Sequence, residues 1–208
     1  MDEAPRDWPA TPAEALDLLA QGNKRFVSGN RLHPHQDADR RTALAPGQRP
    51  FAVLFGCSDS RLAAEIIFDQ GLGDLFVVRT AAHVVGPEVL GSIEYAIATL
   101  DTPLVAVLGH DSCGAVAAAL DAVQRGVAPA GYMRDVVERV TLSVLAVRDR
   151  AATDPEAAVE EHVRYTAELL TQRSTVIAER LAGGRCAVVG LSYRLAEGTV
   201  RQIAAHGL

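Results

Sequence analysis

Cysteine is scarce in this chain. Its 208 residues include only three, Cys57, Cys113 and Cys186. A set that is both small and odd in number does not suit a disulfide framework. We therefore expect the protein to reside in a reducing, cytoplasmic environment. Three roles stay open for the thiols at this point: metal binding, catalysis, and packing in a core.

Positive charge and long apolar runs are scarce as well. The formal net charge is −6 and the isoelectric point is about 5.5, whereas nucleic-acid-binding proteins usually carry a basic surface. No apolar run approaches the roughly 18 residues that predict a membrane-spanning helix. Residues 1–7 are acidic and lack the apolar centre of a signal peptide. We expect neither a nucleic acid nor a membrane as a partner.

The rest of the composition is that of a globular protein. The chain is 49% hydrophobic and 22% charged, and its length suffices for a sizeable core, so we expect one domain over residues 1–208. Residues 1–10 are rich in proline and charge, and we expect them to be poorly ordered. Residues 11–50 are expected to form an N-terminal helical arm. Its first helix would begin with a capping box from Thr11 to Glu14 and end at Gly29, before one short helix.

From residue 51 onward, continuous apolar runs alternate with helical patterns. Such runs are typical of strands that are buried on both faces. A turn pattern over 193–200 resembles a hairpin and predicts an antiparallel edge. The alternation predicts an α/β fold with a mainly parallel central sheet, about four parallel strands plus the antiparallel edge, flanked by helices. The strand runs are 51–56, 75–78, 103–109 and 186–190, and the helices are 86–100, 114–124 and one long helix near 155–182.

Residues with metal-binding side chains follow two of the predicted strands. Cys-Ser-Asp-Ser-Arg occupies 57–61 after the first run, and Gly-His-Asp-Ser-Cys-Gly occupies 109–114 at the end of the third. Ligands of an open parallel sheet bind beyond the C-terminal ends of its strands, so the motifs converge if these strands are neighbours. Cys57, His110 and Cys113 would then form a set that suits zinc and leaves a fourth coordination position open.

Two other interpretations of these three residues stay open on sequence grounds. Free cysteine commonly packs as a small apolar side chain, here beside a hydrogen-bonded histidine. A nucleophilic cysteine with a histidine base is another recurrent arrangement. If zinc is bound, the site exists only once the sheet has formed, and zinc then stabilises the fold.

Asp59 and Arg61 stand two residues apart. In extended chain both side chains would point the same way and could pair. The pair is either a structural brace of the loop or part of a catalytic site. In a catalytic site, Asp59 either accepts a hydrogen bond from zinc-bound water or becomes the fourth zinc ligand. The guanidinium keeps Asp59 ionised in both roles.

The motifs at 57–61 and 109–114 together resemble those of the β-class carbonic anhydrases. The resemblance covers roughly residues 12–200, including 71–79 and 91–96, and is closest to actinobacterial and mycobacterial members. It implies one zinc ion per chain on Cys57, His110 and Cys113, with Asp59 and Arg61 as the catalytic dyad. The implied reaction is the reversible hydration of carbon dioxide to bicarbonate and a proton.

The same resemblance implies a substrate pocket and self-association. Gln36 would offer a hydrogen bond to the substrate, and Phe76 and Tyr95 would form an apolar surface for carbon dioxide. Taken without the resemblance, Phe76 and Tyr95 indicate core packing, and Gln36 indicates a solvated loop. Members of the family place the site at a dimer interface and wrap their N-terminal helices around the partner. We therefore expect a homodimer or a homotetramer.

The chain departs from the family pattern at several positions. The family often has Asn where this chain has Thr80 and His83. Some bacterial members bind bicarbonate at a non-catalytic site through a Trp, an Arg and a Tyr. The corresponding positions here are Leu54, Arg79 and Tyr193, so this regulatory site is incomplete.

Two other functions are compatible with a zinc site on this fold. One is a non-catalytic bicarbonate-binding or sensing protein with a structural zinc. The other is a zinc hydrolase of a small linear substrate such as carbon disulfide. The third cysteine, Cys186, begins an apolar strand and is expected to pack in the core.

Overall fold

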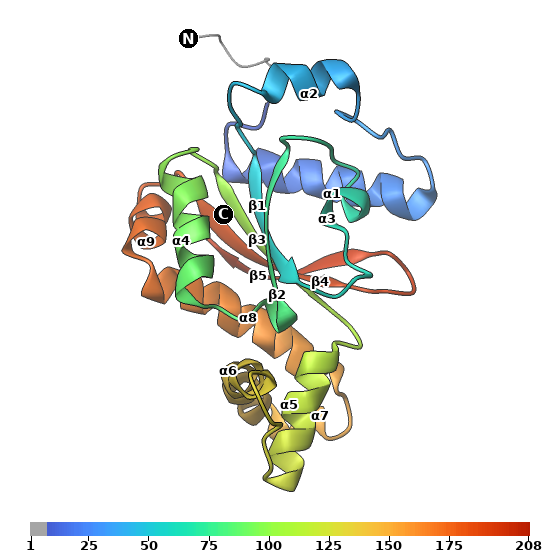
Figure 1. The fold of residues 1–208 in the computed structure, drawn as a ribbon, viewed down its shortest axis with the longest axis vertical. Coiled ribbons are helices and arrows are strands. Elements are labelled where there is room, and N and C mark those ends of the chain that lie inside the picture. The colour runs from blue at the N-terminus through green and yellow to red at the C-terminus, as the bar shows by residue number, and fades with distance from the viewer. Residues whose placement is uncertain (1–7) are drawn as a thin grey trace.

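The computed structural model describes residues 8–208, and a five-stranded sheet lies at its centre (Figure 1). The spatial order is β2-β1-β3-β4-β5; the first four strands are parallel, and β5 is antiparallel to β4. This confirms the predicted α/β fold with an antiparallel edge. The strands are β1 (Ala52–Cys57), β2 (Leu75–Thr80), β3 (Leu104–His110), β4 (Ala187–Tyr193) and β5 (Val200–His206).

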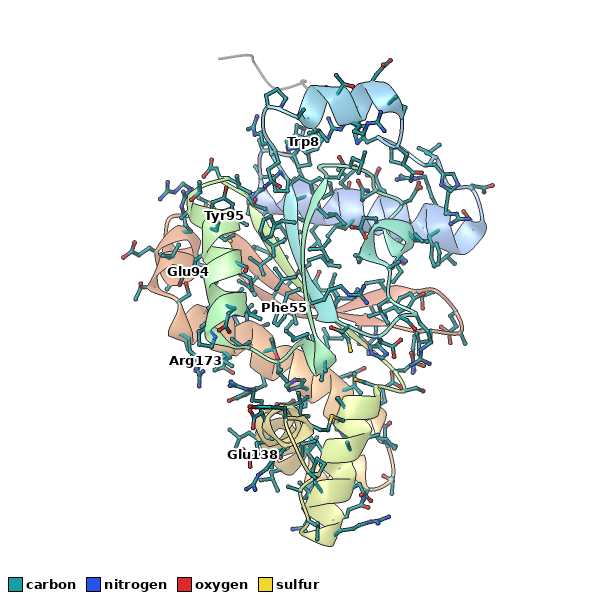
Figure 2. All side chains as sticks on the ribbon, in the orientation of Figure 1. Trp8, Phe55, Glu94, Tyr95, Glu138 and Arg173 are labelled. Atoms are coloured by element: carbon teal, nitrogen blue, oxygen red, sulfur yellow. The ribbon has the colours of Figure 1, made fainter. Side chains whose placement is uncertain are left out.

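Both faces of the sheet carry apolar cores, which is why its inner strands are continuous apolar runs. On β1, Leu54 packs in one core with residues of α1 and α3. Its neighbours Val53 and Phe55 pack in the other core with residues of α4, α8 and α9 (Figure 2). The helices are α1 (Pro12–Ser28), α3 (Ala64–Ile67), α4 (Pro87–Ala98), α8 (Glu156–Arg173) and α9 (Thr175–Ala182).

A third group of helices lies beyond the C-terminal ends of the strands, at the bottom of Figure 1. It consists of α5 (Gly114–Arg125), α6 (Met133–Ala146) and α7 (Arg148–Ala151). The sequence predicted α5 but not α6, although Val137, Val140 and Val144 of α6 are buried at helical spacing. A 3-10 turn, η1 (Ala81–His83), follows β2 and also lies at this end.

The single long helix predicted near 155–182 is wrong, because the chain breaks at Ser174 into α8 and α9. Ser174 is extended, with φ −102° and ψ 112°. Its Oγ accepts a hydrogen bond from the Ile177 amide, which caps α9, and donates one to the Glu94 carboxylate. The uninterrupted apolar stripe concealed this break, since serine caps a helix by leaving helical geometry.

The predicted N-terminal arm begins as expected. Thr11 and Glu14 form the capping box of α1, and Gly29 ends the helix with φ 74°. The short helix expected within 30–50 is α2 (Ala38–Leu44). The buried amide of Asn23 ties α1 to the chain at Ile67, Gly198 and Val200 through three hydrogen bonds.

Trp8 and Pro9, which we expected to be poorly ordered, are packed against the body. The Trp8 and Phe51 rings pack in a T-shaped arrangement with 5.8 Å between their centroids, and the Arg40 guanidinium lies 5.7 Å from the centroid of the Trp8 ring. Ala10 is exposed, and its amide donates to the Glu14 carboxylate at 2.9 Å. The rest of that expectation concerns residues 1–7 and lies outside the described residues. Within residues 8–208, no helix combines the length and apolarity needed to cross a membrane.

Two helical glycines provide a test of this packing. Gly22 of α1 faces the Phe68 carbonyl, and a Cβ there would lie 1.7 Å from the oxygen; Gly91 of α4 has no atom within 4 Å of such a Cβ. We expect Gly22→Ala to lower the free energy of unfolding by about 1–3 kcal/mol through overpacking. Gly91→Ala should raise it by about 0.5–1 kcal/mol, because alanine favours the helix. Urea denaturation of both variants measures this, and equal effects would contradict the close approach.

Candidate metal centre

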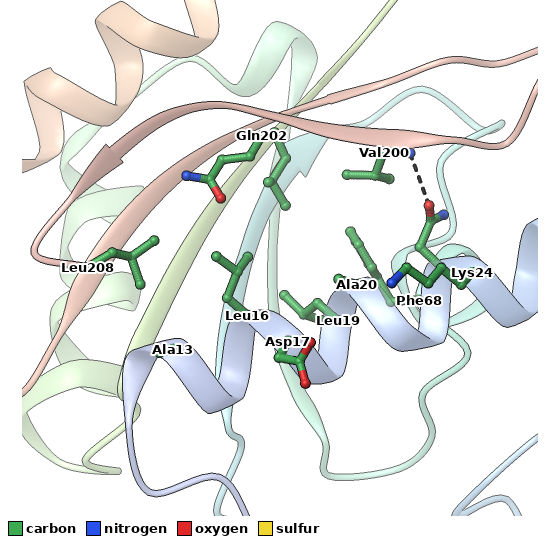
Figure 3. Close-up of a pocket in the computed structure, with 12 residues that line it drawn as sticks. Ala13, Leu16, Asp17, Leu19, Ala20, Lys24, Phe68, Val200, Gln202 and Leu208 are labelled. Carbon is green, nitrogen blue, oxygen red and sulfur yellow. Dashed lines mark hydrogen bonds between the residues drawn. The ribbon is translucent and has the colours of Figure 1, made fainter.

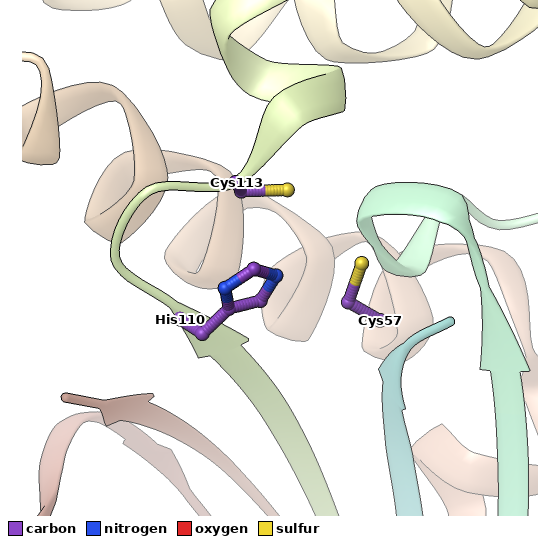
Figure 4. A group of neighbouring side chains, drawn as sticks. All are labelled: Cys57, His110 and Cys113. Carbon is purple, nitrogen blue, oxygen red and sulfur yellow. The ribbon is translucent and has the colours of Figure 1, made fainter. Parts of the chain in front are cut away.

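The parallel pairing of β1 with β3 brings the two sequence motifs together. β1 ends at Cys57 and β3 ends at His110, and the two strands are direct neighbours in the sheet. The sulfurs of Cys57 and Cys113 and a ring nitrogen of His110 lie within 4.8 Å of one another, and all three residues are buried (Figure 4). The predicted convergence is therefore confirmed.

The state of His110 fits a metal ligand. Its Nδ1 lies 2.8 Å from the Asp111 carbonyl oxygen, and since a carbonyl can only accept, Nδ1 carries the hydrogen. In the neutral ring this leaves the lone pair on Nε2. Nε2 is buried and has no hydrogen-bond partner within residues 8–208, which is costly unless the nitrogen binds something else. A ligating histidine usually makes such a hydrogen bond through its other nitrogen.

The two thiols have opposite effects on each other's pKa. A hydrogen bond from the Cys113 thiol is the largest influence on Cys57 and lowers the pKa of Cys57 to about 4, against the opposing effect of burial. The same hydrogen bond, together with burial, raises the pKa of Cys113 above its ordinary value. Cys57 is therefore the thiol that deprotonates more readily, and a divalent cation bound by both sulfurs would displace the protons that they hold. The donor set fits zinc.

Asp59 and Arg61 form a two-point ion pair beside this group. Arg61 Nε donates to Asp59 Oδ1 at 2.9 Å and Nη2 donates to Oδ2 at 2.6 Å. The expectation of extended chain is wrong, because the Leu62 amide donates to the Asp59 carbonyl and closes a turn. The hydrogen bonds from Arg61 hold the pKa of Asp59 below its usual range. Oδ2 of Asp59 lies 3.9 Å from His110 Nε2.

Arg79, which the sequence indicated only as part of an incomplete bicarbonate site, has a second role beside the metal group. It lies on the edge strand β2, opposite Gly56 in register. Its Nε donates to the Cys57 carbonyl at 3.0 Å, and its Nη2 donates to the Asp59 carbonyl at 2.7 Å. Arg79 therefore fixes the backbone on both sides of the turn that carries Asp59. Only its position near the end of β2 could have indicated this, since the pairing register is a tertiary feature.

The structure does not bring Gln36, Phe76 and Tyr95 to the metal group of the same chain. Phe76 pairs with Val53, four residues before Cys57, which is about 13 Å along the strand. Tyr95 contacts Phe76 at 6.2 Å between ring centroids. It lies in the C-terminal half of α4, near the opposite end of the sheet (Figure 2). Its side chain is 47% exposed. Gln36 is exposed on the loop before α2.

The cavities of the chain differ in chemistry. One, of about 490 Å³, lies between α1 and β5 and is mainly apolar (Figure 3). None of the predicted site residues lines it. A cavity of about 290 Å³ opens beside Cys113 and Ser112, with Glu156 and Arg194 on its wall. Cys113 lines the smaller cavity, whereas no candidate ligand lines the cavity between α1 and β5, so we assign the site to the neighbourhood of the smaller cavity.

The comparisons with known proteins agree with this geometry. The sequence model of the family described as carbonic anhydrase matches residues 52–200. The chain is 56% identical over 187 residues to carbonic anhydrase 2 of Mycobacterium tuberculosis, covering 90% of each chain. It is 54% identical over 191 residues to a carbonic anhydrase of Mycolicibacterium smegmatis, covering 92% of this chain and 93% of that one.

A solved structure shows the same fold. The β-carbonic anhydrase CafA of Aspergillus fumigatus superimposes with a TM-score of 0.71 at 28% identity. The alignment covers 90% of this chain and 89% of that chain. The likeness therefore extends over most of the chain.

Replacing Cys113 by serine should abolish tight zinc binding, because a serine hydroxyl is a much poorer zinc ligand than a thiolate. Cys186→Ser is the matched control. Cys186 is fully buried before β4, at the other end of the strands, and burial raises the pKa of its thiol to about 12. Zinc per chain, measured by elemental analysis after dialysis, should fall for Cys113→Ser only. Equal zinc contents in the two variants would exclude Cys113 as a ligand.

Proposed function

The chain belongs to the β-carbonic anhydrase family, and we propose that it catalyses the reversible hydration of carbon dioxide to bicarbonate and a proton with one zinc ion per chain. The observation that carries this proposal is the buried group of two sulfurs and an imidazole nitrogen that no group of residues 8–208 hydrogen-bonds, with a carboxylate 3.9 Å from that nitrogen. Cys57, His110 and Cys113 would hold the ion. When bound, zinc lowers the pKa of a coordinated water from about 15.7 towards roughly 7 and so supplies hydroxide.

The role proposed for Asp59 is to orient the attacking oxygen. An ionised carboxylate only accepts hydrogen bonds, so it accepts the hydrogen of that oxygen and directs a lone pair towards the carbon of carbon dioxide. Arg61 keeps Asp59 ionised and fixes both of its oxygens. Arg61 Nη2 also lies 3.4 Å from the Ser112 carbonyl, which ties the pair to the second motif.

The alternative role of Asp59, as a fourth zinc ligand, stays a prediction. Binding of the Asp59 carboxylate to zinc would compete with the hydrogen bonds from Arg61. The Arg79 contacts to the carbonyls of Cys57 and Asp59 hold the same turn in place. The described geometry therefore supports the form in which the fourth position stays free for water.

Neither alternative function is favoured. A non-catalytic bicarbonate sensor would have no need for the paired Asp59 and Arg61 beside the metal group, and the residues that correspond to the family's non-catalytic bicarbonate site include Leu54 in place of Trp. A carbon disulfide hydrolase would require a restricted entrance. The relatives from Mycobacterium tuberculosis and Mycolicibacterium smegmatis, which are 56% and 54% identical to this chain, are named carbonic anhydrases.

We further propose that the substrate pocket forms between two copies of the chain. Gln36, Phe76 and Tyr95 lie away from the metal group of their own chain, yet Tyr95 is exposed and Gln36 is on the surface. In a homodimer these residues would face the metal group of the partner, Gln36 binding the substrate and the two rings excluding water. A homodimer or homotetramer, one domain per chain and a cytoplasmic location all stay predictions.

Asp59→Ala should keep zinc and lose most of the hydration activity, because the ligands remain while the hydrogen-bond acceptor is gone. Misplacing a reacting group by about 1 Å can cost about 10²-fold in rate. Stopped-flow measurement of carbon dioxide hydration at pH 8, with zinc content determined on the same sample, tests this. Asp149→Ala, an exposed carboxylate on α7, is the control. Full activity of Asp59→Ala would refute the role of Asp59.

A shared pocket predicts complementation between two inactive variants. In a mixed dimer of Asp59→Ala and Gln36→Ala chains, the metal group of the second chain meets the intact Gln36 of the first, so one complete site forms. We expect the co-expressed, co-purified mixture to exceed the activity of both separate variants in the stopped-flow assay. Activity of the mixture no higher than the average of the separate samples would place Gln36 outside a shared site.

A further inference from the structure

The turn behind the metal group has an unusual backbone. Ala82 and His83 of η1 are consecutive non-glycine residues with φ of 50° and 43°. Residues other than glycine rarely adopt this left-handed region, and they hold it only where the surrounding structure imposes it. In η1 this backbone conformation directs the Ala82 amide at the Cys57 sulfur, and 3.3 Å separate the amide nitrogen from the sulfur.

His162 of α8 holds this turn from the other side. Its Nε2 lies 2.9 Å from the Ala82 carbonyl oxygen, and its Nδ1 lies 2.9 Å from Ser143 Oγ on α6. Because the carbonyl can only accept, Nε2 carries the hydrogen, and the Ser143 hydroxyl donates to Nδ1. Burial lowers the pKa of His162 to about 4, so the neutral ring keeps this one tautomer. Ala82 thus receives a hydrogen bond at its carbonyl and gives one to the metal-ligand sulfur.

His83 fills the space between these elements by packing alone. Its ring lies 4.7 Å from that of His162 and meets Phe55 edge-on at 6.2 Å. Neither ring nitrogen has a hydrogen-bond partner within residues 8–208. Gly109 makes room for Val163 of α8, since a Cβ there would lie 2.3 Å from the Val163 side chain, whereas the His83 ring would be 3.4 Å away, at contact distance. The polar restraint on the turn therefore comes from His162 and not from His83.

We propose that His162, oriented by Ser143, is a positioning residue of the metal centre that locks the Ala82–His83 turn so that the Ala82 amide donates to the Cys57 thiolate. A hydrogen bond to a ligand sulfur withdraws negative charge from it and fixes its direction, and groups that support metal ligands in this way typically change affinity about 10- to 100-fold. The inference rests on the metal-binding part of the proposed function.

The test replaces His162 by one residue that lacks a hydrogen-bond donor and by another that has one. His162→Leu removes the donor, and His162→Gln places an amide N–H near the position of Nε2. We expect zinc affinity, measured by competition with a chelator, to fall about 10- to 100-fold in His162→Leu and by much less in His162→Gln. The sulfur-to-cobalt charge-transfer band of the Co²⁺-loaded chain should shift in His162→Leu only. Thr166→Val, which alters another buried polar residue of α8, is the control.

A second substitution separates positioning from a general loss of packing. Glycine adopts positive φ without strain, so adding Ala82→Gly to His162→Leu should return the affinity and the band towards those of the unmodified chain. If His162→Leu does not fold, His162→Phe, which keeps a ring against His83 but offers no donor, takes its place. Circular dichroism verifies folding in each case.

Three results would overturn the proposal: an unshifted band with unchanged zinc affinity in the donor-free variant, no recovery on adding Ala82→Gly, or the same loss in Thr166→Val. A different result would overturn the proposed zinc centre itself, namely the absence of a sulfur-to-cobalt band in the unmodified chain. The two failures are therefore distinguishable.

Discussion

The whole site depends on the parallel pairing of β1 with β3. This pairing sets the ends of two strands side by side, although about 50 residues separate Cys57 from His110 and Cys113 along the chain. Each strand is buried on both faces, so its position is determined by two cores at once. A slip of one residue would reverse the faces and separate the ligands, which links the metal group to the integrity of the sheet.

Around this group, backbone groups are held by side chains that have no direct part in metal binding. Arg79 donates hydrogen bonds to the carbonyls of Cys57 and Asp59, and Arg61 donates to the Asp59 carboxylate. His162 donates to the carbonyl of Ala82, whose amide donates to the Cys57 sulfur. These contacts start from β2, the 57–61 turn and α8, and so the site is supported from three directions. The bonds from Arg79 to the Cys57 carbonyl and from His162 to Ala82 are partly or fully buried, where a hydrogen bond is stronger than in water.

Much of the fold could be predicted because its signals are local. The apolar runs located four strands, the capping box located the start of α1, and the 193–200 turn indicated the antiparallel edge. The failures have local causes too. Ser174 divides the predicted long helix because its hydroxyl caps α9 and bonds Glu94. α6 was not predicted, although its buried valines repeat at helical spacing. The two residues of positive φ in η1 are alanine and histidine, which carry no turn signal.

The sequence by itself determined the ligand types, the Asp59–Arg61 spacing and the family, because chemistry-bearing residues stand directly after recognisable strands. Only the tertiary structure decided which of these residues meet. It placed Cys57, His110 and Cys113 within reach of one ion and added Arg79, Ser143 and His162 as supports. It also set Gln36, Phe76 and Tyr95 apart from the metal group of their own chain. The physical reason is that strand order, register and hydrogen-bond partners are fixed by contacts between segments far apart in the chain, which no local pattern records.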